Sequence, residues 1–103
     1  AMATKQFGEA RLFYLGALVF TPEDHLLHSN LAVALTSFGM HRAAAAAARH
    51  CVRLAPHWAK GYFRLAVALK SCREVVEARS AASRAAELAP EDQQVRHLMA
   101  ELG

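Results

Sequence analysis

Apolar residues recur at helical spacing along most of the chain, and their pattern repeats after 34 residues. The pentapeptide Leu-Ala-Val-Ala-Leu occupies 31–35 and again 65–69, and Leu-Ala-Pro occupies 54–56 and 88–90. A fixed period of this size is typical of helical repeat proteins, in which each unit buries its apolar face on its neighbours. The pattern therefore predicts an all-α array of stacked helical hairpins.

Breaks in the apolar pattern divide each repeat into two helices. In the first repeat the stripe runs from His25 to Ser37, stops at Gly39 and resumes from Arg42 to Leu54. Pro56 cannot continue a helix and disfavours helical geometry in the residue before it, so the second helix ends there. The next repeat has the same plan, with helices predicted at 58–71 and 75–88 and a turn near Arg73.

The two ends of the chain fit the same register, so we predict one domain over 1–103. Its parts are half a repeat, two complete repeats and a terminal helix. In sequence they are the second helix of a truncated repeat at 5–20, a repeat at 24–56, a repeat at 58–90 and a capping helix at 92–102.

The composition suits an array of closely packed helices. The chain is 54% hydrophobic but only 8% aromatic, and much of the difference is alanine, which has the best helix propensity and a small side chain. Neither a signal peptide nor an apolar run long enough to span a membrane is visible, and two cysteines are too few for a disulfide framework. We therefore expect a cytoplasmic protein without membrane contact. The net charge of +3 is spread thinly, so no nucleic-acid surface is predicted either.

The repeat positions resemble those of the tetratricopeptide repeat (TPR) family. This pattern prefers a large residue at position 4, Leu at 7, a small residue at 8, a large apolar residue at 11, Ala at 20 and 27, and Pro at 32. The matching residues are Tyr62, Leu65, Ala66, Leu69, Ala78, Ala85 and Pro90 in one repeat and His28, Leu31, Ala32, Leu35, Ala44, Cys51 and Pro56 in the other. The resemblance implies an α-α superhelix of helix pairs whose first helices line a concave groove.

The resemblance also implies which positions of each first helix face the groove. In this sequence these positions carry both polar and apolar side chains. They are Ser29, Asn30, Val33 and Ser37, then Lys60, Phe63, Arg64, Val67 and Ser71, then Gln94, His97 and Glu101. Lys60 and Arg64 are four residues apart and share a helix face, and Asn30 lies one repeat before Arg64. An amide beside two cations is suited to bind a carboxylate through charge-assisted hydrogen bonds.

A narrower resemblance is to the carboxylate-clamp TPR domains of heat-shock-organising co-chaperones. In that family an Asn on one first helix, with Lys-Gly-Tyr-x-Arg on the next, grips chaperone C termini that end in Glu-Glu-Val-Asp. The resemblance implies that Asn30 donates to the terminal carboxylate and that Lys60 and Arg64 hold the terminal and upstream acidic groups. Val33, Phe63, Val67 and Gln94 complete the expected peptide site. A Lys and an Asn that the family takes from a preceding first helix have no counterpart in this sequence.

Two other interpretations of these residues stay open at this point. Lys60 and Arg64 are of a kind common on solvated helix faces, where they pair with acidic neighbours. Trp58 and Tyr62 are equally compatible with packing between repeats.

The sequence offers little support for metal binding, a cofactor or catalysis. His25 and His28 lie three apart on one predicted helix, but nothing supplies the other ligands of a tetrahedral site. No basic group is placed by the sequence to activate Cys72, and phosphate-binding Gly-rich loops and paired catalytic carboxylates are missing. We therefore predict a binding protein with no cofactor or metal, and not an enzyme.

The predicted helix at 5–20 is apolar on its outward side as well as its inward side. Its outward residues are Leu12, Phe13, Leu15 and Val19. An exposed apolar surface favours association, so a self-associating scaffold is the alternative function. A longer array in which neighbouring helices cover this segment explains the pattern equally well.

Overall fold

The computed structural model describes residues 24–103, and over this range the chain forms five α-helices joined by short turns. The helices are α2 (His25–Ser37), α3 (His41–Leu54), α4 (Ala59–Ser71), α5 (Val75–Leu88) and α6 (Gln93–Leu102). The predicted all-α array is confirmed, and no helix in 24–103 is long and apolar enough to cross a membrane. The predicted helix at 5–20, with Leu12, Phe13, Leu15 and Val19, lies outside the described residues.

Aspartate side chains cap the first and last of these helices. The Asp24 carboxylate accepts a hydrogen bond from the Leu26 amide at 2.9 Å, at the start of α2. Asp92 accepts from the amides of Gln94 and Val95, at 2.9 Å and 3.2 Å, at the start of α6. Each cap satisfies backbone donors that a helix end leaves free and is worth about 1 kcal/mol.

Left-handed residues close the first helix of each hairpin. Gly39, with φ of 78°, follows α2, and Arg73, with φ of 63°, follows α4. The two positions are one repeat apart, so the same turn is built once with glycine and once with arginine. A side chain in this conformation is strained, because its Cβ approaches the following carbonyl oxygen.

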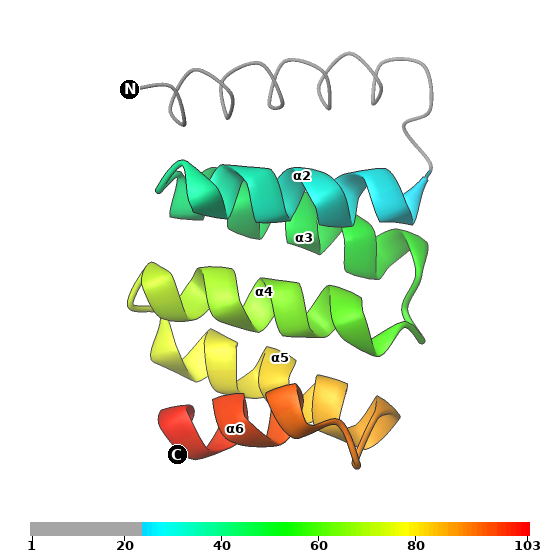
Figure 1. Ribbon diagram of the computed structural model, residues 1–103, viewed down its shortest axis with the longest axis vertical. Coiled ribbons are helices and arrows are strands. Elements are labelled where there is room, and N and C mark those ends of the chain that lie inside the picture. Colours follow the sequence, from blue (N-terminus) through cyan, green and yellow to red (C-terminus); the bar gives the residue numbers. More distant parts are fainter. Residues whose placement is uncertain (1–23) are drawn as a thin grey trace.

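The helices lie in two layers. Helices α2, α4 and α6 lie side by side in one layer, and α3 and α5 form the other (Figure 1). We call these the inner and the outer layer. Helix α4 contacts each of the other four described helices. These contacts together fix its position and determine which of its side chains face solvent.

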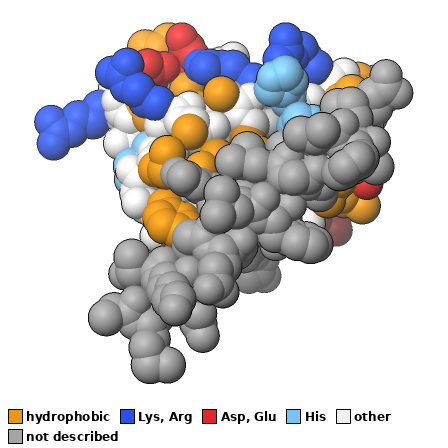
Figure 2. Space-filling view, turned by 90° about the horizontal axis from the view of Figure 1, so that it is seen from above, with side chains coloured by type: hydrophobic (Ala, Val, Ile, Leu, Met, Phe, Trp, Pro, Cys, Tyr) orange, Lys and Arg blue, Asp and Glu red, His pale blue; other side chains and the backbone are white. Residues whose placement is uncertain are grey.

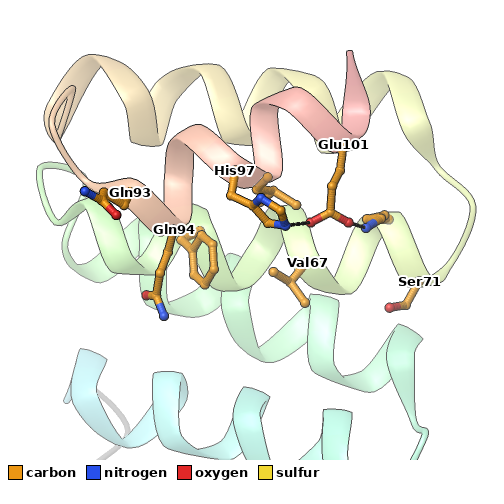
Figure 3. A pocket seen from close by; sticks show the side chains of 9 residues that line it. Val67, Ser71, Gln93, Gln94, His97 and Glu101 are labelled. Atoms are coloured by element: carbon orange, nitrogen blue, oxygen red, sulfur yellow. Dashed lines mark hydrogen bonds and ion pairs between the residues drawn. The ribbon is translucent and has the colours of Figure 1, made fainter.

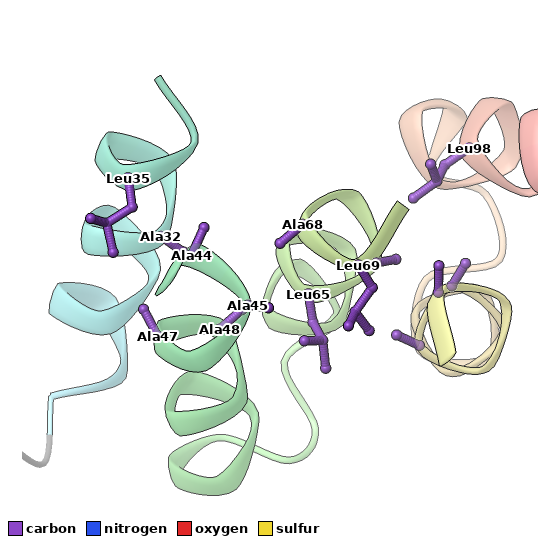
Figure 4. Close-up of a cluster of buried hydrophobic side chains, with 14 of the residues drawn as sticks. Ala32, Leu35, Ala44, Ala45, Ala47, Ala48, Leu65, Ala68, Leu69 and Leu98 are labelled. Carbon is purple, nitrogen blue, oxygen red and sulfur yellow. The ribbon is translucent and has the colours of Figure 1, made fainter. Parts of the chain in front are cut away.

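Small side chains fill the contacts between the layers. Alanines are the commonest residues in the core, and they lie between helices where larger leucines pack beside them (Figure 4). Those with no exposed surface are Ala44, Ala48, Ala66, Ala68, Ala78, Ala82 and Ala85. A methyl side chain lets two helix backbones approach closely, which explains the alanine-rich composition.

Helix α4 approaches α3 closely at Gly61. A Cβ atom at this position would lie 3.2 Å from both the Cys51 Sγ and the Val52 Cγ1 atoms. Cys51 is fully buried there, and burial raises the pKa of its thiol. The absence of a side chain at Gly61 therefore sets how closely α4 approaches α3.

The exposed arginines of α3 belong to the outer layer, and one of them forms an ion pair with α5. Arg49 lies 2.9 Å from the Glu77 carboxylate of α5 and 4.0 Å from that of Glu74. Seen from the α2 end, Lys and Arg side chains gather along one edge with acidic side chains among them (Figure 2). These exposed pairs contribute little to stability.

Replacing Arg73 by glycine is expected to raise the free energy of unfolding by about 1 kcal/mol, because glycine adopts a left-handed backbone without strain. The Arg73 side chain is exposed and has no hydrogen bond or ion pair within residues 24–103, so little else is lost. The matched change is Gly39→Ala, where an added Cβ meets nothing within 4 Å. It is expected to lower stability by about 1 kcal/mol through backbone strain alone. Urea denaturation measures both, and a loss of stability in Arg73→Gly would contradict the assignment.

Gly61→Ala is expected to destabilise the domain by about 1 kcal/mol, because overpacking outweighs the gain in helix propensity. The cost is expected to shrink in a Cys51→Ala background, where the Sγ atom is gone. A double-mutant cycle measured by thermal denaturation isolates this contact, since the propensity gain is the same in both backgrounds. Equal costs in the two backgrounds would show that the thiol does not set the spacing.

Candidate functional site

Two adjoining pockets lie on the inner layer. A pocket of about 120 Å³ lies between α2 and α4, and one of about 660 Å³ lies between α4 and α6. We call them the α2/α4 pocket and the α4/α6 pocket, and together the inner-layer groove. Val67 lines both, so the two pockets meet across α4. The α2/α4 pocket is lined by Ala32, Val33, Thr36, Ser37, Arg64 and Val67.

Arg64 places a guanidinium group in the α2/α4 pocket. Its Nε atom is buried and has no hydrogen-bond partner among the described residues, and its Cζ lies 5.6 Å from the centroid of the Phe63 ring. The ring face attracts the cation and supports it from one side. A buried donor without an acceptor is costly, so this group is suited to accept an anionic ligand.

Arginines on the outer layer are differently arranged. A pocket of about 420 Å³ there is lined by Arg49 and Arg84 among other residues. Arg49 is paired with Glu77, and Arg84 lies 3.0 Å from the Glu87 carboxylate. Of these three pocket-lining arginines, Arg64 alone has no carboxylate partner within 24–103.

Asn30 and Lys60 are exposed and lie one helical turn before the residues that line the pocket. Asn30 precedes Val33 on α2, and Lys60 precedes Arg64 on α4. Neither lines the α2/α4 pocket, and neither has a side-chain partner within the described part of the chain. Helices α2 and α4 begin at the same end of the inner layer (Figure 1), so Asn30 and Lys60 each lie nearer that end than the pocket-lining Val33 and Arg64 that follow them.

The α4/α6 pocket has an apolar floor and a polar rim. Phe63, Val67 and Leu98 form its apolar part, and Gln94 is among the polar residues at its edge. The remaining lining residues are Lys70, Ser71, Gln93, His97 and Glu101. The pocket is therefore shaped for an apolar group with polar surroundings.

Charges at the rim of this pocket cancel one another. Glu101 forms an ion pair with Lys70, and the His97 Nε2 atom lies 3.1 Å from its other oxygen (Figure 3). The hydrogen bond and charge of Lys70, then the charge of His97, lower the pKa of the Glu101 carboxyl. Glu101 is therefore ionised near neutral pH, and Lys70 is already neutralised.

Comparison with known proteins agrees with this architecture, although no protein-family model matches the chain. An Hsp70-Hsp90 organizing protein of Triticum aestivum is 33% identical over 93 residues, which are 90% of this chain and 16% of that protein. The chain thus spans less than a fifth of the length of this relative.

Two solved structures superpose on almost the whole chain. The Sgt2 TPR domain from Aspergillus fumigatus has a TM-score of 0.89 at 25% identity, covering 99% of this chain and 69% of that one. The first TPR of Spaghetti (RPAP3), bound to an HSP90 peptide of sequence SRMEEVD, has a TM-score of 0.90 at 21% identity, covering 98% and 80%. The chain has the tetratricopeptide repeat (TPR) fold.

The structure of this TPR domain brings together some of the predicted site residues. Val33, Arg64 and Val67 share the α2/α4 pocket, and Phe63, Val67 and Gln94 share the α4/α6 pocket. Ser29 was expected to face the groove, but it is only 6% exposed and is buried.

Lys70 is the charged groove residue that the sequence pattern missed, and the uncharged ones are Ala32, Thr36, Gln93 and Leu98. It lies three residues after Val67, and that spacing places the two side chains on adjacent parts of one helix face. The location of Lys70 in the groove could therefore have been predicted from its helical spacing to Val67. Its pairing with Glu101 joins positions 31 residues apart and depends on how α6 packs on α4.

The histidines of the TPR domain make ring contacts. His25 meets the edge of the Trp58 ring at a centroid distance of 5.0 Å, and His28 stacks on His50 at 5.1 Å. Burial, then the charges of Arg53 and His28, lower the pKa of His50. Within residues 24–103 no three His, Cys, Asp or Glu side chains are grouped to hold a metal ion.

Proposed function

We propose that this TPR domain is a protein-interaction module, a co-chaperone-like adaptor that binds the acidic C terminus of a partner protein. The bound peptide lies in the inner-layer groove, and its last residues are of the Glu-Glu-Val-Asp type. Lys60 and Arg64 attract the acidic groups, and Asn30 donates a hydrogen bond to the terminal carboxylate. Val33, Phe63, Val67 and Gln94 contact the rest of the peptide.

The observation that carries this proposal is the unpaired state of the cations at one end of the groove. Arg64 has a buried Nε without an acceptor in 24–103, and Lys60, one turn earlier, also has no anionic partner there. Two arginines of the outer layer are instead paired with acidic side chains, Arg49 with Glu77 and Arg84 with Glu87. A C-terminal peptide supplies several carboxylate oxygens to such a site at once.

The comparisons support the same ligand chemistry. The structure of the first RPAP3 TPR holds a peptide that ends in Glu-Glu-Val-Asp. The wheat relative is named for organising Hsp70 and Hsp90. Heat-shock chaperone C termini are therefore the partners we propose for this chain, in a cytoplasmic setting, with binding rather than catalysis as the activity and no cofactor required.

Self-association stays an alternative prediction. It depends on Leu12, Phe13, Leu15 and Val19, which lie outside the described residues. No observation on 24–103 favours it over peptide binding.

The proposal is tested with the peptide Ser-Arg-Met-Glu-Glu-Val-Asp as free acid and as C-terminal amide, by isothermal titration calorimetry. The free acid is expected to bind and the amide to bind at least about tenfold more weakly, because amidation removes the terminal charge. Lys60→Ala and Arg64→Ala are each expected to weaken binding of the free acid by about 10- to 100-fold. Arg64→Lys, which keeps the charge but loses the planar fork, is expected to fall in between.

Arg42→Ala is the matched control, since it removes one positive charge from the exposed surface of the outer layer. It is expected to leave the affinity within about twofold of the original chain. Equal affinity for acid and amide, or unchanged binding in both Lys60→Ala and Arg64→Ala, would refute the proposed function.

A further inference from the structure

The exposed face of α3 is almost entirely basic. In chain order its exposed residues are Arg42, Ala46, Arg49, His50, Arg53 and Leu54. The helix contains no aspartate or glutamate, so no charge on α3 itself offsets the three arginines. The fold therefore gathers on one surface three positive charges that stand apart in the sequence.

The spacing of this face is that of a helix-packing seam. Four of its residues are separated by four, three and four positions, and we call them the α3 stripe: Arg42, Ala46, Arg49 and Arg53. Residues at this spacing form a line nearly parallel to the helix axis, here about 16 Å long. The small side chain of Ala46 in the middle lets a second helix approach closely, with arginines on either side of it.

The repeat symmetry shows that the fold does not require these cations. One repeat later, the corresponding positions on α5 hold no basic residue, being Val76, Ser80, Ser83 and Glu87. Arg42 also lies in the first turn of α3, where the positive end of the helix dipole makes a cation unfavourable. The stability of the helix itself therefore does not explain the α3 stripe.

Two of the three arginines have no anionic partner. Arg49 pairs with Glu77 at 2.9 Å, but Arg42 forms no ion pair among residues 24–103. The Arg53 Nη2 atom lies 3.2 Å from the His50 Nδ1 atom. Burial and then the charge of Arg53 lower the pKa of His50, so its ring is uncharged near neutral pH and can accept this hydrogen bond. The charges at the two ends of the α3 stripe are therefore available to a ligand.

We propose that the α3 stripe is a second interaction surface, which binds an acidic helix of a partner protein. Carboxylates of that helix pair with Arg42 and Arg53, and its backbone passes over Ala46. Arg42 and Arg53 are separated by eleven positions, which is about three helical turns. Acidic residues at the same separation fall on one face of a partner helix, whichever way it runs. The surface is on the outer layer, so this inference goes beyond the proposed function and does not depend on it.

The surroundings of the α3 stripe favour an acidic helix over a nucleic acid or a membrane. Those partners need a broad basic surface, whereas Glu74 and Glu77 of α5 border the stripe beside Arg49. A phosphate backbone lying across the outer layer would meet these carboxylates. A helix lying along α3 can instead place its acidic residues at the two ends of the stripe. One helix face buries a small area, so the complex is expected to be weak and salt-sensitive.

NMR titration of the isotopically labelled full chain tests this inference. The probe is an eighteen-residue alanine-based helix with both ends blocked and with glutamates spaced four, three and four residues apart. It has no terminal carboxylate, so it lacks the group that the inner-layer groove is proposed to bind. The amide signals of α3 are expected to shift, with a dissociation constant of about 0.1–1 mM at low salt. Shifts confined to the inner-layer groove, or none at all, would overturn the inference.

The double variant Arg42→Ala, Arg53→Ala is expected to weaken this binding about tenfold, because it removes both unpaired cations. Its matched control is Arg73→Ala, Arg96→Ala, which removes the same net charge from exposed positions outside the α3 stripe. The control is expected to bind within about twofold of the original chain. Circular dichroism establishes that both double variants are folded. Equal weakening in the two would show attraction by net charge alone, which the inference does not survive.

Two further comparisons identify the occupant. The same peptide with its glutamates divided between opposite faces of the helix is expected to bind about fivefold more weakly, because only half of them reach the stripe. A short DNA duplex at equal concentration and salt is expected to leave the α3 signals bound to the acidic helix. Equal binding of the two peptides, or displacement of the acidic helix by the duplex, would show that the α3 stripe does not select an acidic helix.

Discussion

Close approach of helix backbones is the constraint on which the rest of this structure depends. The contacts between the layers are made by alanines with no exposed surface, such as Ala44 and Ala48 on α3 and Ala78 and Ala82 on α5. Each alanine buries little apolar area, so its contribution comes from letting larger neighbours on both helices pack against each other. A larger side chain at any of these positions would separate the helices and displace every element stacked beyond it.

The groove follows from the way this packing holds α4. One face of α4 is buried, and at Gly61 it is so close to Cys51 that no side chain fits without movement. Lys60 lies on the exposed side of α4 and Arg64 lies beside the buried face, and neither has a carboxylate partner within 24–103. The fold thus separates the residues that stabilise α4 from those that remain available to a ligand.

Much of the fold and part of the candidate site could be predicted from the sequence. The 34-residue period, Gly39 and the Leu-Ala-Pro segments give the helices and their turns, because these signals are local. The same register places Val33, Arg64 and Val67 on one face, and the structure confirms that they share a pocket. Local sequence patterns are sufficient to predict those features that depend on interactions within one helix or one turn.

The rest depends on how helices pack, which a local pattern does not contain. The Lys70–Glu101 pair joins α4 to α6, and its formation requires the spacing and angle between two helices. The displacement of Asn30 by one turn from the α2/α4 pocket likewise reflects the relative offset of α2 and α4. Arg73 shows the converse case, since its left-handed backbone is dictated by the turn and not by its own propensity.

The availability of a charge, and not its presence, decides what the groove attracts. Lys70 has the same side chain as Lys60 and lies on the same helix, yet its field is cancelled by a carboxylate on α6. Both side chains of that pair are about 40% exposed, so the pair adds little to stability. Because the fold gains so little from it, the consequence of placing Glu101 there is mainly electrostatic. It confines the attraction for anions to the part of α4 that carries Lys60 and Arg64, and it leaves the wider pocket beside α6 to apolar contact.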